Sequence, residues 1–232
     1  MPERIVLDRA RFAPGAAELI GRKLLALSAG RADLSLGLSG GTTIVRVYEH
    51  LAALDGVSLN WMAINFFFGD ERAVAPDHRD SNYRLAREAL LSRIPALPQR
   101  IHRMEAERAD LDQAARDYEA VLPASLDLLL LGMGEDGHVA SLFPGSPTLE
   151  ETERSVVPAF GGTPRVARLT VTPKVLAHAA EIIVMVSGSR KRDAVSRALE
   201  GPLNPSACPA QLVRRATWIL DDEAAAGLDH AR

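Results

Sequence analysis

The chain has 232 residues, of which 47% are hydrophobic and 25% are charged, and its net charge at neutral pH is −3. This length suits one large α/β domain with its own hydrophobic core, so we expect a single domain over residues 1–232. The nearly balanced charge excludes a bulk electrostatic field that would attract nucleic acid or an acidic membrane, and affinity for an anion must come from a few placed cations and backbone amides.

The chain contains one cysteine, Cys208, so an intrachain disulfide is excluded. No run approaches the roughly 18 apolar residues that a membrane span requires, and the first residues lack the apolar core of a signal peptide. We therefore expect a cytoplasmic protein that has neither a membrane nor a nucleic acid as its partner.

Short apolar runs alternate with amphipathic segments along the chain. The runs have the length of strands, and they occupy residues 34–38, 62–68, 126–133, 182–186 and 217–220. Helical periodicity is present over residues 44–51, 111–122 and 194–199. This alternation predicts an α/β fold with a doubly wound, mostly parallel sheet flanked by helices, and a ligand site where the strands end. Residues 144–164 follow neither period, so we expect an irregular excursion near that site.

A glycine-rich turn follows the first of these apolar runs. Gly40, Gly41 and Thr42 join it to an amphipathic helix, and glycines allow the backbone to approach a ligand closely. The amides at the start of a helix suit a phosphate. The alternative is a plain turn between strand and helix, with Ser39 or Thr42 as the helix cap.

Three charged residues, 70–72, follow the second apolar run. Arg72 is suited to binding an anion with two hydrogen bonds, and Asp70 is suited to accepting hydrogen bonds or orienting a base. The alternative is a solvated loop with a weak ion pair. Asn82 stands at a predicted helix start, where it either supplies first-turn polarity or belongs to a site that includes Asp70.

A histidine stands in a second glycine-rich loop, which follows the buried run at residues 126–133. Gly134 and Gly137 keep the backbone open around Asp136 and His138. An imidazole is largely the free base at neutral pH, so His138 is a candidate to take a proton from water, with Asp136 holding the ring or the loop. The alternative is a histidine that is merely part of a turn.

Two further cations are candidates for a phosphate site. Lys191 lies in the first turn of a predicted helix, where the helix dipole disfavours a cation unless an anion is bound there. Arg168 alternates with apolar neighbours as on one face of a strand, so it is either a phosphate ligand or an exposed strand residue.

Together, these segments resemble the 6-phosphogluconolactonase family over most of the chain, in the order LSGGTT, FGDER, DSNY, LGMGEDGHVASLFPG and SGSRK. The resemblance implies a Rossmann-like, NagB/RpiA-like fold shared with glucosamine-6-phosphate deaminases, and hydrolysis of 6-phospho-D-glucono-1,5-lactone to 6-phosphogluconate in the oxidative pentose phosphate pathway. It also implies that His138 is the general base, that Asp70 is an active-site carboxylate, and that the phosphate is bound by Arg72, Lys191 and the loop of Gly40, Gly41 and Thr42. The resemblance assigns Asn82, Asp136 and Arg168 to the substrate site less directly.

Two alternatives to the lactonase stay open. Amino-sugar-phosphate isomerases or deaminases share the Asp-Gly-His loop but continue it with Asn-Glu-Pro, where this chain has Leu-Phe-Pro and Phe143 is unable to transfer a proton. A sensor would bind a phosphosugar without turnover. The chain lacks a metal-ligand cluster and a Gly-x-Ser-x-Gly elbow, so we expect no metal or other cofactor and no serine nucleophile. The expected partner is a phosphosugar lactone; the oligomeric state is left open, a monomer being compatible with the family.

Overall fold

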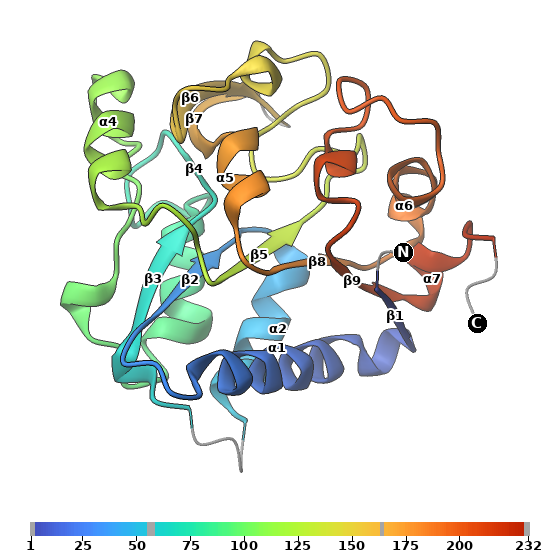
Figure 1. Ribbon diagram of the computed structural model, residues 1–232, viewed down its shortest axis with the longest axis horizontal. Coiled ribbons are helices and arrows are strands. Elements are labelled where there is room, and N and C mark those ends of the chain that lie inside the picture. Colours follow the sequence, from blue (N-terminus) through green and yellow to red (C-terminus); the bar gives the residue numbers. More distant parts are fainter. Residues whose placement is uncertain (1–2, 55–58, 163–164, 230–232) are drawn as a thin grey trace.

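The computed structural model describes residues 3–54, 59–162 and 165–229. Its centre is a six-stranded parallel sheet in the order β1-β9-β8-β5-β2-β3 (Figure 1). These strands are β1 (Arg4–Leu7), β2 (Leu34–Leu38), β3 (Ile64–Phe68), β5 (Leu128–Gly132), β8 (Ile182–Val186) and β9 (Thr217–Asp221). The chain winds from β2 to β3 on one side and from β5 to β9 on the other. The winding reverses between β2 and β5, and ligands bind at such switch points.

Helices cover both faces of this sheet, as Figure 1 shows for α1 and α2 on one side and α5 on the other. The helices are α1 (Phe12–Ser28), α2 (Thr42–Ala52), α3 (Asn82–Ala86), α4 (Leu111–Val121), α5 (Pro173–His178), α6 (Arg192–Leu199) and α7 (Asp222–Ala225). A π-helical turn (Arg87–Leu91) extends α3, and short 3₁₀ helices occur at Arg9–Arg11, Trp61–Ala63, Pro98–Arg100, Pro147–Glu150, Ser189–Lys191 and Pro209–Val213. The predicted α/β fold with a doubly wound parallel sheet is confirmed. Within the described ranges, no helix is long and apolar enough to cross a bilayer.

A second, antiparallel sheet of three strands contains β4 (Asp70–Arg72), β7 (Val166–Val171) and β6 (Val156–Gly161), in the order β4-β7-β6. The expectation of an irregular excursion over residues 144–164 is wrong where β6 forms. As the edge strand of this sheet, β6 tolerates Pro158, which disguises its period. The interpretation of residues 70–72 as a solvated loop is also wrong, because they form β4.

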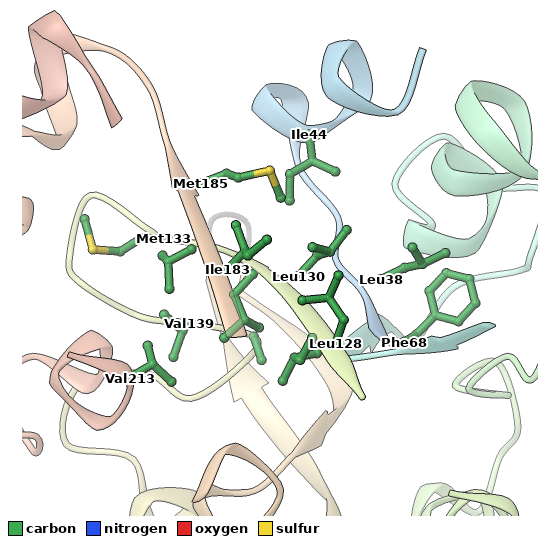
Figure 2. Packing of buried hydrophobic residues seen from close by; sticks show 14 of the residues in the cluster. Leu38, Ile44, Phe68, Leu128, Leu130, Met133, Val139, Ile183, Met185 and Val213 are labelled. Carbon is green, nitrogen blue, oxygen red and sulfur yellow. The ribbon is translucent and has the colours of Figure 1, made fainter. Parts of the chain in front are cut away.

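The hydrophobic core encloses the central strand β5 and continues into the loop that follows it. Leu128, Leu130 and their neighbours in β5 are fully buried, because helices or the small sheet cover both faces. Figure 2 shows Leu130 within a cluster that continues through Met133 to Val139, so core packing extends into the loop after β5.

Two of the predicted apolar runs are longer than the strands that form within them. The first residues of 62–68 form a 3₁₀ turn, and β5 is confined to Leu128–Gly132.

Candidate active site

A cleft of about 670 Å³ lies beyond the carboxyl ends of the parallel strands, at the switch point. The loops after β2, β3, β5 and β8 line it, together with one residue of β7. Nine of the candidate residues line this cleft: Gly40, Gly41, Thr42, Asp70, Arg72, Asn82, His138, Arg168 and Lys191. The remaining candidate, Asp136, contacts His138. The fold therefore brings together residues that are up to about 150 positions apart in the sequence.

His138 is oriented by Asp136. The imidazole Nδ1 lies 2.6 Å from Asp136 Oδ1, and the same oxygen accepts a 3.1 Å hydrogen bond from the His138 amide. An ionised carboxylate only accepts, so Nδ1 carries a proton, and in the neutral imidazole the lone pair is therefore on Nε2. Gly134 is necessary here, since a Cβ at this position would overlap both the imidazole and the Asp136 carboxylate. The loop thus holds the imidazole in one orientation and fixes the tautomer of its neutral form.

The charge of Asp136 is maintained by the same contact. Burial raises the pKa of the Asp136 carboxyl, but the hydrogen bond and the charge of His138 oppose burial and outweigh it, so this pKa is lowered overall. Asp136 therefore stays ionised at neutral pH. An ionised partner also favours the imidazolium that forms when His138 takes a proton.

The glycine-rich loop after β2 opens the first turn of α2 toward the cleft. Gly41 occupies the N-cap position with φ 108° and ψ 156°, a backbone conformation available essentially only to glycine. No side chain caps α2. The alternative of a cap by Ser39 or Thr42 is therefore wrong. The Ile44 amide bonds the Gly41 carbonyl, and the amides of Thr42 and Thr43 stay available for a ligand.

Asn82 locks this loop to the next one. Its Nδ2 donates to the Asp70 carbonyl at 2.9 Å and to Asp70 Oδ1 at 3.0 Å. Its Oδ1, buried without a hydrogen-bond partner in the described part of the chain, lies against Gly40, where a Cβ would overlap it. Asn82 is only 1% exposed, so it does more than supply first-turn polarity: it fixes the spacing of two cleft loops.

We predict that Gly40→Ala destabilises the fold by about 1–3 kcal/mol, because the new methyl group meets an amide that is unable to retreat. Asn82→Ala removes that amide, so adding Gly40→Ala to Asn82→Ala should cost much less than adding it to the wild type. Urea denaturation of the four proteins in this cycle measures the coupling. Additive free energies of unfolding would show that the two loops do not contact each other in this way.

Asp70 belongs to a buried network. Its Oδ2 accepts a 2.6 Å hydrogen bond from Ser141 Oγ and lies 3.5 Å from Arg168 Nη1, which is itself 3.4 Å from Ser141 Oγ. Arg168 also donates to the carbonyl of Gly161. Burial lowers the pKa of Arg168, opposed chiefly by the charge of Asp70. The alternative of Arg168 as an exposed strand residue is wrong, because the side chain is buried. Its ion pair with Asp70 compensates for the burial of the guanidinium.

Arg72 is held by one end of its guanidinium. Nη1 donates to the Asp80 carbonyl at 2.6 Å, while the buried Nε has no partner within the described residues. Glu71 accepts hydrogen bonds from the amides of Arg72, Asn82 and Tyr83, which ties β4 to the start of α3. The hydrogen bonds to Glu71 order the loop between β4 and α3. Arg72 lines the cleft, and among the described residues its guanidinium has N–H groups that are free to bind a ligand.

The cationic side of the cleft comes from the loop after β8. Lys191 Nζ donates to the Met133 carbonyl at 2.9 Å, which brings it next to the histidine loop. Burial lowers the pKa of Lys191, although the charges of Glu135 and Asp136 raise it in part. Lys191 closes a 3₁₀ turn that leads into α6, in place of the predicted first α-helical turn.

The sequence analysis did not predict three residues at or next to the cleft: Arg9, Glu223 and Ser141. Arg9 and Glu223 line the cleft and form an ion pair, and Ser141 donates a hydrogen bond to Asp70. Arg9 precedes the first predicted strand and therefore had no predicted neighbour. The only signal for Ser141 was its place three residues after His138. Among the described residues, no group of three or more His, Cys, Asp or Glu is placed to hold a metal ion.

The sequence matches a family model described as glucosamine-6-phosphate isomerases/6-phosphogluconolactonase over residues 7–220. The chain belongs to this family. Among curated members, it is 35% identical to a 6-phosphogluconolactonase of Synechocystis over 211 residues, which cover 85% of this chain and 86% of the relative. It is 36% identical to a 6-phosphogluconolactonase of Mycobacterium tuberculosis over 217 residues, which cover 86% of this chain and 87% of the relative.

Solved structures of the family share this fold. The 6-phosphogluconolactonase of Thermotoga maritima superposes with a TM-score of 0.85 at 28% identity, covering 96% of this chain and all of the other. The enzyme of Leishmania guyanensis gives the same TM-score and identity, with 99% of each chain covered. A monomeric glucosamine-6-phosphate deaminase superposes with a TM-score of 0.84 at 23% identity, a likeness that extends to the fold alone.

Proposed function

We propose that this family member is a 6-phosphogluconolactonase, which hydrolyses 6-phospho-D-glucono-1,5-lactone to 6-phosphogluconate in the oxidative pentose phosphate pathway. The observation that carries the proposal is the His138–Asp136 pair at a cleft that Arg72 and Lys191 also line. The curated lactonases at 35% and 36% identity support the same activity. We also propose that the chain forms one domain and acts in the cytoplasm; the single parallel sheet supports the first inference and the lone buried cysteine supports the second.

The geometry suits general-base hydrolysis of the lactone. His138 Nε2 takes a proton from water as the water oxygen attacks the lactone carbonyl carbon, which forms the new C–O bond and a tetrahedral oxyanion. Asp136 stabilises the resulting imidazolium. When the intermediate collapses, the bond from the carbonyl carbon to the ring oxygen breaks, and the imidazolium returns its proton to that oxygen. The products are a carboxylic acid, which ionises, and a free hydroxyl.

We assign the phosphate to the cationic side of the cleft. Lys191 and Arg72 supply charge, and the turn of Gly40, Gly41 and Thr42 supplies amides at the start of α2. Such contacts hold one end of the substrate, so that its carbonyl carbon is positioned for attack. Asp70, Asn82 and Arg168 are buried, and we assign them to shaping and polarising the floor of the cleft.

Phe143 favours the lactonase over a deaminase. Where deaminases carry a glutamate, this chain places a buried aromatic ring against His138, with the two ring centroids 4.7 Å apart. No acid stands at this position to serve ring opening of an amino sugar. Hydrolysis of a lactone that is already cyclic needs only the base and a water molecule.

The test compares three outcomes with purified protein. Freshly generated 6-phosphogluconolactone and glucosamine 6-phosphate are supplied in parallel, and the spontaneous rate of lactone hydrolysis is subtracted. We expect turnover of the lactone alone. Ammonia release from glucosamine 6-phosphate would establish the deaminase instead. Binding of 6-phosphogluconate without turnover of either compound would establish a sensor.

Lys191 gives a prediction about pH. Because burial lowers its pKa, Lys191 loses its charge at a lower pH than an ordinary lysine, and affinity for 6-phosphogluconate should weaken as pH rises through that range. The phosphate is already a dianion above about pH 7.5 and does not contribute to this change. Calorimetric titration of wild type and Lys191→Arg measures it. The arginine variant should keep a flat profile; equal loss of affinity in both would exclude Lys191 as the source.

A further inference from the structure

The ring of Phe143 lies beside two groups of the cleft, the His138 imidazole and the Arg168 guanidinium. On one side, the His138 imidazole has its centroid 4.7 Å from the Phe143 centroid, with the planes inclined by 50°. On another side, the Arg168 guanidinium carbon lies 5.4 Å from the same centroid. Both distances are within the range in which an aromatic quadrupole attracts a cation. Phe143 is therefore in a position to sense the charge of the imidazole.

The fold leaves this ring little freedom. Phe143 is 7% exposed, and β6 approaches it so closely that a Cβ at Gly161 would overlap the ring. The loop that carries it is closed by the hydrogen bond from the Leu142 amide to the Val139 carbonyl, and both of these residues are fully buried. A ring clamped by backbone on one side keeps a constant position relative to His138.

Each of the two groups at this ring has its own carboxylate partner. Asp136 pairs with His138, and Asp70 pairs with Arg168. Of the other charged groups around the loop, Glu135 pairs with Arg190, and Lys191 bonds the Met133 carbonyl. The pair of Arg168 with Asp70 is neutral, whereas the pair of His138 with Asp136 carries one negative charge until His138 is protonated. The ring face is then the apolar group next to the new charge.

We propose that Phe143 is a positioning residue, which holds the imidazole of His138 against Asp136 and stabilises the imidazolium formed during the reaction. This inference rests on the proposed function only for its kinetic consequences. A leucine at the same place fills much of the volume but has no π face and no flat surface to fix the imidazole plane. The imidazole should then be a weaker base and less well oriented.

The test uses Phe143→Leu, Phe143→Tyr and a matched control, Phe160→Leu. Phe160 lies on β6 one residue from Gly161, is 58% exposed, and stacks with Arg165 instead of His138. The first readout is the NMR titration midpoint of the His138 imidazole, assigned by comparison with His138→Ala. The second is the pH profile of kcat/KM for the lactone, with kcat and KM measured separately.

For Phe143→Leu we expect the midpoint and the acid limb of the profile to move to lower pH by about half a unit, and kcat to fall about tenfold with KM little changed. Phe143→Tyr, which keeps a π face, should retain most of the wild-type midpoint and of the wild-type kcat. Phe160→Leu should match the wild type. If Phe143→Leu does not fold, Phe143→Met carries the same test, because methionine also lacks a π face.

An unchanged midpoint in the leucine variant would overturn the proposal, and so would an equal shift in the Phe160 control. The midpoint is read without turnover. A wild type that fails to hydrolyse the lactone would therefore refute the proposed function, while the midpoint would still decide the role of Phe143.

Discussion

His138→Ala should lower kcat for lactone hydrolysis by about 10²–10⁴-fold, the contribution that a positioned general base makes. The effect should fall on kcat and leave KM nearly unchanged, because the residues assigned to the phosphate lie on other loops of the cleft. Initial rates with freshly generated lactone, after subtraction of the spontaneous rate, measure this loss. His138 is partly exposed to the cleft, so its removal should cost little stability.

The control for this variant is affinity for the product. If the His138→Ala protein folds and still binds 6-phosphogluconate, the substitution has removed the catalytic step and has left ligand binding intact. His138→Gln, which keeps hydrogen-bonding capacity but is unable to take the proton, should be as slow as the alanine variant. Near wild-type turnover in the glutamine variant would mean that His138 orients water without acting as a base.

The second large effect concerns the buried pair of Asp70 and Arg168. Arg168→Met should lower the free energy of unfolding by about 3–5 kcal/mol, because it leaves the Asp70 carboxylate buried without its counter-charge. Both side chains are 7% exposed, so water is unable to replace the guanidinium. Activity should fall as well, since Asp70 also holds Ser141 and Asn82 in place. Urea denaturation measures the stability change.

A matched surface pair provides the control. Arg84 and Glu88 form an exposed ion pair one turn apart, so Arg84→Met should cost only about 0.2–1 kcal/mol. The double variant Asp70→Asn with Arg168→Met removes both buried charges and should recover part of the loss. Equal destabilisation by Arg168→Met and Arg84→Met would show that the pair with Asp70 is not desolvated in solution.

The central sheet was predictable because buried parallel strands are continuous apolar runs. Residues 34–38 and 182–186 coincide with β2 and β8. The small antiparallel sheet was not predictable in the same way. Its strand β4 consists of three charged residues that are held by pairing with β7, and the edge strand β6 contains a proline and a glycine. An apolar run in the sequence indicates a strand that helices bury on both faces. The strands β4 and β6 lack such a run, and they form because they pair with β7, which is distant from β4 in the chain.

Spacing also placed the candidate residues at the strand ends, where the fold brings them together. It did not show which of them are exposed to a ligand. Asn82 is a polar residue at a helix start in the sequence, yet its side chain forms the link between Asp70 and Gly40. Ser141 carries no motif of its own and becomes part of the network only through β7 and β4. Such roles depend on tertiary distances that a linear pattern does not contain.

The most direct measurement is real-time ¹³C NMR of 6-phosphogluconolactone labelled at the carbonyl carbon, with wild type, His138→Gln and buffer alone followed side by side. The lactone signal converts to the carboxylate signal of 6-phosphogluconate as hydrolysis proceeds. We predict rapid conversion with the wild type and a rate near that of buffer with the glutamine variant. Conversion by the wild type at the buffer rate would contradict the assignment of this cleft to lactone hydrolysis. Rapid conversion by both proteins would contradict the assignment of His138 as its base.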